Sequence, residues 1–234
     1  MKTSQLPDKA RVENEVFEKI LDLDNKNILE LGCGRADLTR LIAEGGPGRT
    51  ITAAEVDEIQ HQKNLLINDL SNVSFILAGA ESLPIEDNSI DIVFMFKSLH
   101  HVPMELMDDA LGEISRVLKP GGKAYISEPV YDGPLNEVLR IFHDEGTVRA
   151  AAYEAIKRNT NSSSLQLSEE ILFNNMASFT DFEDFQTKVI NVTHTEHNLS
   201  LAALQKVKVQ FDLNMTEAGA RFLAPNRVNI LQKK

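Results

Sequence analysis

Apolar and polar residues follow a regular rhythm along the first half of the chain. Five apolar runs have the length of buried strands, at 27–31, 50–55, 73–77, 90–96 and 123–127. Helical segments are expected between them at 37–45, 58–69 and 104–118. Strands and helices that alternate in this way predict a parallel, doubly wound α/β sheet.

After residue 130 this rhythm changes. Residues 134–158 are expected to be helical, followed by a polar break at 159–164 and a second helix that Ser168 caps and that runs to Met176. The remaining segments are an alternating strand at 185–192, a helix at 199–215 and a short last strand at 227–231. Near the start of the chain, apolar residues at helical spacing predict an amphipathic helix over 8–23.

A glycine turn joins the first predicted strand to the first helix. Gly32-Cys33-Gly34 lets the backbone bend sharply and lets a ligand approach at the carboxyl end of the strand. The dinucleotide fingerprint G-x-G-x-x-G would require a third glycine at position 37, where this chain has Asp37. Glu30 adds a second carboxylate just before the turn. Two carboxylates disfavour a phosphate and favour a cationic nucleoside such as S-adenosylmethionine.

Six motifs then occur in a fixed order: ELGCGRAD at 30–37, Glu55, AGAESLP at 78–84, SIDIVF at 89–94, LHHV at 99–102 and LKPGGK at 118–123. Together they resemble class I S-adenosylmethionine-dependent methyltransferases, and most closely the subgroup that methylates quinones and sterols, including the ubiquinone/menaquinone-biosynthesis type. The resemblance implies a mostly parallel seven-stranded sheet. It also implies that the two closing strands form an antiparallel hairpin. In this chain about thirty residues, 193–224, separate them, more than a hairpin loop needs, so the sequence itself predicts helical inserts after strand 5 and before the last strand.

The resemblance also implies how the chain is organised. We expect a single methyltransferase domain over 1–234, with the cofactor-binding core at 25–130. Residues 1–24 would form a helical lid over the cofactor, or a helix that only covers the sheet. Inserts at 131–165 and 193–224 would roof the active site and set the choice of substrate, because function sits on the variable parts of a shared scaffold.

S-adenosylmethionine is the implied cofactor, and S-adenosylhomocysteine the product. Glu55, at the end of the second strand, is suited to bind both ribose hydroxyls. The residues implied to contact the cofactor are Glu30, Gly32, Cys33, Gly34, Glu55, Val56, Gly79, Ala80, Glu81, Phe96 and Lys97. The chain departs from the family at Gly79, where an acid usually contacts the adenine amine, and at Ala36, which replaces a third glycine. Glu81 is a candidate to replace the missing acid, and Cys33 is expected to pack as a small apolar residue.

Methyl transfer from a sulfonium is an in-line displacement, so the protein mainly positions the acceptor and excludes water. A general base is needed only when the acceptor loses a proton. His100 and His101 are the candidates for that base, although a histidine at a strand end can equally serve a structural role. The side chains of His143-Asp144-Glu145 would point in different directions on a helix, and His194 with Glu196 and His197 has no further ligands nearby in sequence, so no metal is predicted.

Charge and composition limit the partners. The 234 residues carry a net charge of −11, which argues against nucleic acid and leaves a small organic methyl acceptor as the expected partner. One cysteine, no apolar run long enough for a membrane span and no apolar signal core favour the cytoplasm. A homodimer is left open. Two alternative functions are a non-catalytic S-adenosylmethionine-binding partner subunit and an NAD-dependent oxidoreductase.

Overall fold

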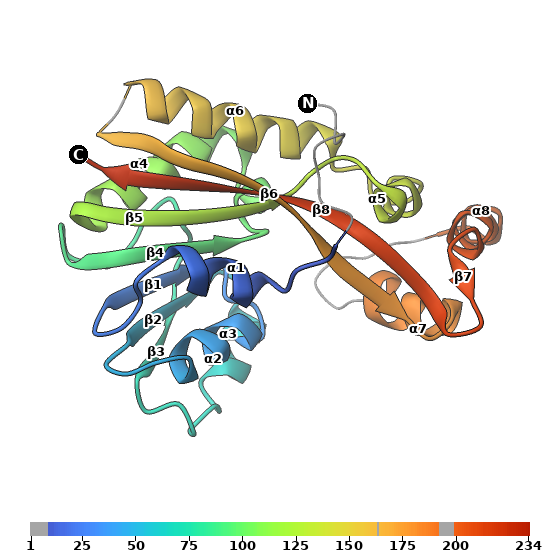
Figure 1. Ribbon diagram of the computed structural model, residues 1–234, viewed down its shortest axis with the longest axis horizontal. Helices are drawn as coiled ribbons and strands as arrows, with labels where there is room; N and C mark the ends of the chain where they lie inside the picture. Colours follow the sequence, from blue (N-terminus) through green and yellow to red (C-terminus); the bar gives the residue numbers. More distant parts are fainter. Residues whose placement is uncertain (1–8, 163, 192–198) are drawn as a thin grey trace. The chain divides into compact units, whose positions relative to one another are not determined.

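A computed structural model describes residues 9–162, 164–191 and 199–234, and its elements are shown in Figure 1. The helices are α1 (Glu13–Ile20), α2 (Asp37–Glu44), α3 (Glu58–Asn64), α4 (Met107–Val117), α5 (Pro134–Leu139), α6 (Gly146–Ser162), α7 (Phe182–Phe185) and α8 (Leu201–Asp212), with shorter helical turns η1 (Leu99–His101), η2 (Met104–Leu106) and the π-helix η3 (Gln186–Ile190). The strands are β1 (Asn27–Leu31), β2 (Thr50–Glu55), β3 (Val73–Leu77), β4 (Ile90–Phe96), β5 (Leu118–Pro129), β6 (Leu165–Phe179), β7 (Met215–Thr216) and β8 (Gly219–Lys233).

The predicted α/β sheet is confirmed. Its strands lie in the order β3-β2-β1-β4-β5-β8-β6, and β7 pairs with β8 outside this path. Strands β1 to β5 are parallel, with Leu29 opposite Thr52 on one side and Val93 on the other, and the pairing of β4 with β5 shifts register between Ile90 and Ile92. The end strands are antiparallel, as in class I methyltransferases. All five carboxyl ends of the parallel strands therefore meet at one edge of the sheet.

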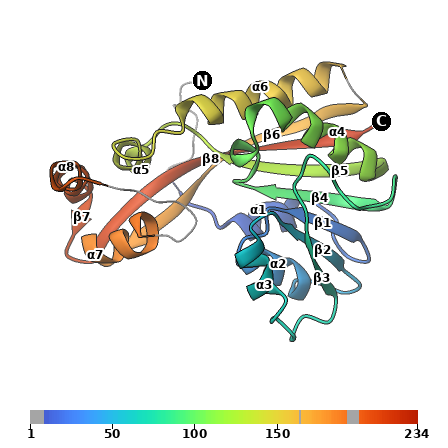
Figure 2. The same cartoon turned by 180° about the vertical axis from the view of Figure 1, so that it is seen from behind.

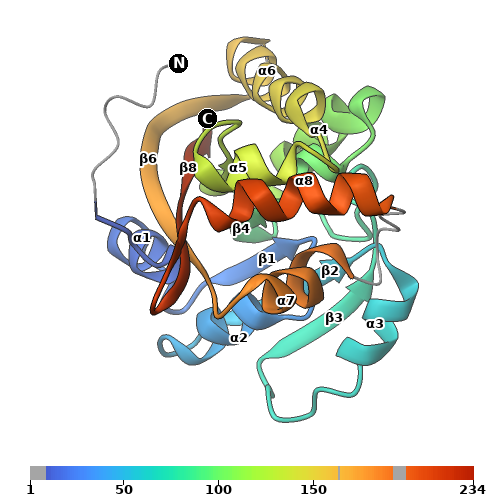
Figure 3. The ribbon, with the colours of Figure 1, turned by 90° about the vertical axis from the view of Figure 1, so that its right-hand side faces the viewer.

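The chain divides into two compact units. Unit 2 comprises Glu13–Glu128, Ala150–Ile171 and Arg227–Lys234, and it holds the parallel strands. Unit 1 comprises Met1–Val12, Pro129–Arg149 and Leu172–Asn226. Its own core is built largely from phenylalanine side chains of α7, α8, β6 and β8. Figure 3 shows α8 in this unit beside α5, with which it makes contacts.

Within unit 2, helices cover both faces of the sheet. Helices α4 and α6 lie on one face of the sheet (Figure 2), and Ile114 and Ile156 belong to the same buried cluster as Leu29 and Val93. On the other face, Phe17 of α1 packs against β4, with ring centroids 5.1 Å from Phe94. Strand β4 is therefore buried on both faces, which explains its nearly continuous apolar sequence.

Three sequence-based assignments after residue 160 are wrong. Residues 168–176 were expected to be helical but belong to β6, where sheet pairing overrides the local propensity of Ser168 and the glutamates after it. The polar break at 159–164 is occupied in part by the end of α6. The strand expected at 185–192 is instead α7 and η3, because Asp181 caps a helix by accepting from the N–H of Asp184 at 2.8 Å.

The other late elements are confirmed with changed bounds. The helix expected at 199–215 is α8, and the strand expected at 227–231 lies inside the longer β8. The amphipathic helix expected at 8–23 is shorter, as α1. Among the described residues, no helix is both long and apolar enough to cross a membrane.

Candidate functional site

The glycine turn after β1 is held by hydrogen bonds to β2. The N–H groups of Gly32 and Cys33 both donate to the carbonyl of Ala54, at 2.9 and 3.0 Å. Gly32 and Gly34 have φ angles of 70° and 52°, a region that favours glycine. Ala36 also lies there, at φ 64°, so the methyl group that replaces the family glycine is accommodated in a left-handed backbone.

The two glycines are needed for different reasons. A Cβ on Gly32 would lie 2.5 Å from Ser98 Oγ, so only glycine lets the β1 turn approach the loop after β4. A Cβ on Gly34 would meet no atom within 4 Å. The backbone at Gly34 therefore borders open space, which is what a turn that cradles a ligand requires.

Glu55 lies at the carboxyl end of β2, as predicted, and fastens the turn. Its carboxylate accepts hydrogen bonds from the N–H groups of Gly34 at 2.7 Å and of Val56 and Asp57 at 2.9 Å each. The residue is buried, whereas the apolar side chain of Val56 is 69% exposed beside it. Asp57 caps α3 by accepting from Ile59 and Gln60, as a helix N-cap does.

The two other carboxylates near the turn have different surroundings. Glu30 is buried and accepts a 2.6 Å hydrogen bond from Thr39 Oγ1. Burial raises the pKa of Glu30 to about 7, the Thr39 bond opposes this shift and the charge of Glu55 adds to it. Asp37 is exposed and pairs with Arg35 at 2.9 Å. Glu55 is thus the member of this trio whose carboxylate hydrogen-bonds the turn itself.

Cys33 packs inside the turn as expected. Its thiol is buried, and Asn64 of α3 donates to the sulfur at 3.5 Å and to the carbonyl of Gly34 at 2.8 Å. Burial, reinforced by the charges of Glu30 and Glu55, raises the pKa of the Cys33 thiol. The sulfur is therefore a neutral packing group, and it lacks the thiolate character that a nucleophile needs.

The loop after β3 contains the predicted adenine-contact residues Gly79, Ala80 and Glu81. The Glu81 side chain folds back over Gly79, so that a Cβ on Gly79 would lie 2.3 Å from one carboxylate oxygen of Glu81 and 2.5 Å from the other. Ala80 is buried beneath them. An acidic group from position 81 therefore occupies the space that a side chain at position 79 would fill.

Phe96 and Lys97, also predicted to contact the cofactor, end β4. Phe96 is buried in a cluster of aromatic rings, with centroids 5.1 Å from Phe94, 5.6 Å from Tyr125 and 5.8 Å from Phe17. Lys97 has a left-handed φ of 51° and donates its N–H to the carbonyl of Ser127 at 2.7 Å. Such backbone conformations are costly for side-chain-bearing residues and cluster at functional sites.

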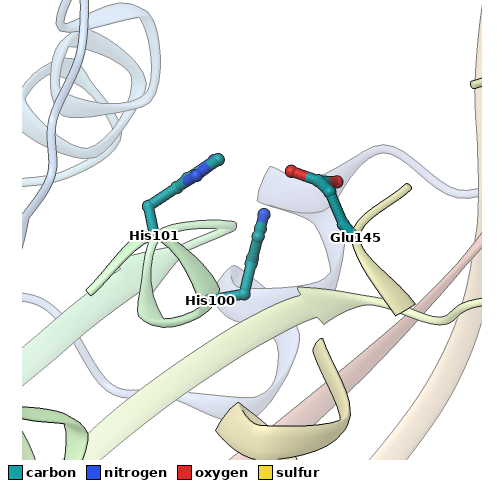
Figure 4. A group of neighbouring side chains, drawn as sticks. All are labelled: His100, His101 and Glu145. Carbon is teal, nitrogen blue, oxygen red and sulfur yellow. The ribbon is translucent and has the colours of Figure 1, made fainter. Parts of the chain in front are cut away.

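The two candidate base histidines follow on η1, and Figure 4 shows both rings rising from this turn. Their ring centroids are 4.1 Å apart. His100 is buried and hydrogen-bonds through Nδ1 to the carboxylate of Glu128, near the end of β5. The other Glu128 oxygen accepts from the N–H of Leu99 at 2.9 Å. His101 is exposed.

The remaining histidine groups pair with neighbouring side chains where the structure describes them. His143 Nε2 lies 3.0 Å from Glu145, whose carboxylate also pairs with Arg149 at 2.6 Å. Asp144 accepts from the Tyr131 hydroxyl at 2.9 Å. His194, Glu196 and His197 lie outside the described residues.

Sequence reasoning missed Glu128, Thr39 and Asn64. Glu128 could have been noticed because it is an ionisable residue at the end of an apolar strand and directly precedes Pro129. Thr39 and Asn64 left no comparable signal, because helical polar residues are common and their contacts depend on how the helices pack.

The open space at Gly34, the buried Glu55 carboxylate and the exposed Val56 suit a nucleoside with two hydroxyls and a flat base. The same arrangement offers no cluster of lysines or arginines for a pyrophosphate within the described turn residues 30–37, where Arg35 is already paired with Asp37. The residues present therefore fit S-adenosylmethionine.

Comparison with known proteins supports this assignment. Residues 29–126 match the family model described as "Methyltransferase domain". The chain is 35% identical over 122 residues to the ubiquinone/menaquinone biosynthesis C-methyltransferase UbiE of Shewanella oneidensis, an alignment that covers 50% of this chain and 47% of that protein. The chain thus spans about half the length of the curated relatives it matches.

Solved structures share the fold along nearly the whole chain. A protein from Bacillus halodurans C-125 aligns with a TM-score of 0.65 and 15% identity, covering 94% of this chain and 97% of that one. The YcgJ protein from Bacillus subtilis aligns with a TM-score of 0.62, also at 15% identity, covering the same shares of the two chains. At these identities the likeness shows the fold alone. The family match over residues 29–126 therefore identifies the cofactor-binding segment of the chain as a class I S-adenosylmethionine-dependent methyltransferase domain.

Proposed function

We propose that this chain transfers a methyl group from S-adenosylmethionine to a small organic acceptor by in-line displacement. The observation that carries the proposal is the glycine turn of β1 fastened to the buried carboxylate of Glu55, at the carboxyl edge of the parallel sheet. When bound, the cofactor supplies a methyl group on a positively charged sulfur, and that charge makes the sulfur a good leaving group. The protein's task is then to position the acceptor and to exclude water.

Each part of the cofactor has a proposed contact. Glu55 accepts from the ribose hydroxyls, and the exposed apolar Val56 packs against the adenine. Glu81 takes the adenine amine in place of the acid missing at position 79, because its carboxylate already occupies that space. Gly32, Cys33 and Gly34 border the cofactor through their backbone.

Glu30 has a less direct role in this proposal. Its carboxylate accepts a hydrogen bond from Thr39 Oγ1. With a pKa of about 7, Glu30 carries a partial negative charge near neutral pH, and that charge favours the ammonium group of the cofactor. Lys97 borders the site through its left-handed backbone. Phe96 supports the site from the aromatic cluster.

The acceptor is a small molecule in this proposal. The net charge of −11 disfavours a polyanionic partner such as nucleic acid. The relative from Shewanella oneidensis is named for C-methylation in ubiquinone/menaquinone biosynthesis, which makes hydroquinones reasonable first probes. The segments after residue 130, predicted to set the choice of acceptor, lie outside the matched family segment 29–126.

Two measurements test the proposal. Isothermal titration calorimetry with S-adenosylhomocysteine and with NAD should show binding of the first ligand alone. Incubation with S-adenosylmethionine and a panel of hydroquinones, catechols and amines should then yield S-adenosylhomocysteine in an acceptor-dependent way. NAD binding without S-adenosylhomocysteine binding would refute the assignment. Cofactor binding with no turnover on any probe would favour the non-catalytic partner subunit.

A further inference from the structure

Two buried N–H groups in unit 1 have no hydrogen-bond partner among the described residues. They are the Nε–H of Arg149, in the first turn of α6, and the side-chain amide nitrogen of Asn136, on α5. Asn136 is 6% exposed and the Arg149 side chain is 10% exposed. A buried donor without a partner costs free energy, so both groups call for a ligand or water that accepts from them.

The orientation of the Asn136 amide follows from its contact with Arg149. Arg149 Nη1 lies 3.1 Å from Asn136 Oδ1. A guanidinium has only donors, so the amide atom that faces it must be the oxygen, and the amide nitrogen is left to donate elsewhere. The other terminal nitrogen, Nη2, donates to Glu145 at 2.6 Å and fixes the guanidinium in turn. The two unpartnered donors therefore have set positions.

Arg149 and Asn136 both line a cavity of about 40 Å³ whose walls all belong to unit 1. Much of the remaining lining is apolar and includes Leu135 and Leu139 of α5 and Pro225 of β8. The two leucines are half-buried, so a ligand can reach this wall from solvent. A cavity of this volume accommodates about three water molecules, and therefore also a group of comparable size such as a carbonyl.

The walls are fixed by backbone contacts between β8 and the segment that follows β5. The N–H of Val130 donates to the carbonyl of Pro225 at 2.8 Å. A Cβ on Gly133 would lie 2.9 Å from Pro225 Cδ, so glycine lets α5 begin this close to β8. The cavity is thus bounded by ordered chain, which lowers the entropy lost when a ligand binds.

Charge and hydrogen-bonding capacity select the ligand. Arg149 and Asp132 carry opposite charges within the lining, and Glu145 also pairs with the Arg149 guanidinium, so an anion meets no excess of positive charge. Both unpartnered groups are donors. A carbonyl oxygen has two lone pairs and no hydrogen, so it can accept from both, whereas a hydroxyl would add a donor that itself needs a partner.

We propose that this cavity binds the carbonyl oxygen of the methyl acceptor, with Arg149 Nε–H and the Asn136 amide as its two donors. The inference rests on the proposed methyl transfer and on the predicted role of the insert at 131–165 in choosing the acceptor. It narrows the substrate class to neutral molecules with a carbonyl group on an apolar frame, in addition to the atom that receives the methyl group. Arg149 and Asn136 are then specificity-determining residues.

Three phenols that differ in one substituent are matched probes. para-Hydroxyacetophenone carries a neutral carbonyl, para-ethylphenol lacks it, and para-hydroxybenzoate has a carboxylate. In ¹⁵N-labelled protein without cofactor, the resonances of Arg149 Nε–H and the Asn136 amide are assigned by their loss in Arg149→Lys and Asn136→Asp. Both should shift on titration with para-hydroxyacetophenone. The other two phenols should bind at least about tenfold more weakly, because one offers no acceptor and the other is charged.

Variants of Asn136 test the donor itself. Asn136→Asp keeps the oxygen that faces Arg149 but places a second oxygen where the donor was, so para-hydroxyacetophenone should bind at least about tenfold more weakly. Asn136→Leu, which has similar size and no charge, should also weaken binding and excludes an effect of the buried charge alone. Asn175→Asp, outside the cavity lining, is the matched control because an aspartate still accepts from the N–H of Met176.

Turnover tests whether the cavity acts on the methyl acceptor. With S-adenosylmethionine, KM for para-hydroxyacetophenone should be at least about tenfold lower than KM for para-ethylphenol, because the carbonyl adds two hydrogen bonds. Asn136→Asp should abolish this difference, and Asn175→Asp should retain it. Equal KM values for the two phenols in the wild-type protein would overturn the proposal.

The outcomes separate this inference from the proposed function. Methylation of the phenols without any shift of the two resonances would preserve the methyltransferase and show that the cavity holds water only. Tighter binding of para-hydroxybenzoate would make the cavity an anion site and equally overturn the inference. If no phenol is methylated, the titrations decide, because they need neither cofactor nor turnover. A carbonyl-dependent shift of both resonances would then support the assigned ligand class, and its absence would refute it.

Discussion

At the scale of single residues, the cofactor turn is specified by its backbone more than by its charges. Ser98 leaves no room for a side chain at position 32. The Glu55 carboxylate accepts hydrogen bonds from three backbone N–H groups around the turn. The carboxylates near the turn contribute unequally to its negative charge, because Glu30 is partly protonated near neutral pH and Asp37 pairs with Arg35. Glu55 is therefore the residue on which cofactor affinity should depend most.

Replacing Glu55 by glutamine should weaken S-adenosylhomocysteine binding by about 1–3 kcal/mol, because charge-assisted bonds to the ribose become neutral ones. Glutamine keeps one acceptor oxygen for the N–H groups of Val56 and Asp57, but its amide nitrogen cannot accept from the N–H of Gly34, so part of the loss arises in the turn itself. Calorimetric titration measures the change. Asp57→Asn is the control, since asparagine caps a helix as well as aspartate does, and its affinity should match the wild type. Equal affinities for all three proteins would show that the ribose lies elsewhere.

Glu81 should contribute to affinity as a substitute for the family's acid. Glu81→Ala should weaken cofactor binding by about 1 kcal/mol through loss of one hydrogen bond to the adenine amine. Gly79→Asp should recover that affinity only in the Glu81→Ala background, because in the wild type the two side chains would compete for the same space. Titration of the two single variants and the double variant measures this. If the losses of cofactor affinity in the two single variants simply added up in the double variant, Glu81 would not be a replacement for the family's acid.

Glu30 should make stability depend on pH. Its pKa rises from 4.5 to about 7 on folding, so the folded state binds this proton more tightly than the unfolded chain. The contribution is fully present below pH 4.5 and is lost as pH rises through 7, amounting to about 3 kcal/mol. Urea unfolding of the cofactor-free protein between pH 4.5 and 8.5 measures this.

Glu30→Gln, which can still accept from Thr39, supplies the comparison for that experiment. The variant should gain stability relative to the wild type as the pH increases. A constant difference between the two proteins across the range would mean that folding does not change the pKa of Glu30.

At the scale of elements, the first 130 residues could be predicted because local pattern and tertiary environment agree. The strands β1, β2 and β4 lie in the interior of the sheet and each is followed by a helical segment, whereas β3 forms the sheet edge and leads through a loop into β4. The predictions for the later segments were wrong where the local sequence pattern and the tertiary environment conflict. Residues 168–176 contain helix-favouring glutamates but pair in the sheet as β6, and sequence alone does not show which strand will be available as a partner.

The candidate site divides in the same way. Residues within one motif, such as Gly32 and Gly34, could be identified because two closely spaced glycines after a strand indicate a tight turn with positive φ angles. Contacts between distant elements could not. The partnership of His100 with Glu128 depends on β4 and β5 lying side by side in register, which no local pattern encodes.

Helix α1 illustrates how an element is fixed to the sheet. Phe17 is fully buried against Phe94 and Phe96, and Glu18 pairs with the buried Arg49 at 2.6 Å. Glu13 accepts from the Tyr125 hydroxyl at 2.6 Å, and burial raises the pKa of Glu13 while that bond opposes the shift. This packing favours the sheet-covering role of the helix, and the lid remains a prediction.

Phe17→Ala should therefore destabilise the protein by about 3–5 kcal/mol, the usual cost of removing a buried phenylalanine. Urea unfolding measures the change. Val12→Ala, just before the helix and 56% exposed, is the control and should change stability by less than about 0.5 kcal/mol. Weakened cofactor binding at unchanged stability would instead indicate that the helix acts as a lid.

At the scale of the whole molecule, the two compact units divide the proposed tasks. Unit 2 carries every proposed cofactor contact, together with His100 and Glu128. Unit 1 carries most of the described inserts after β5 and has a phenylalanine core of its own. Cofactor binding and acceptor choice are thus assigned to parts of the chain with separate cores, so the two properties should respond separately to ligands.

Hydrogen exchange followed by mass spectrometry should reveal this division. Binding stabilises the closed state of the segments that contact a ligand, so saturating S-adenosylhomocysteine should slow exchange in peptides covering 30–36, 54–57 and 78–82. Peptides from 129–149 and 172–191 should change much less, because the proposed contacts lie in unit 2. Glu55→Gln at the same ligand concentration should lose most of the protection. Protection concentrated in unit 1 would place the cofactor away from the β1 turn, and the roles given to Glu55 and Glu81 would fail with it.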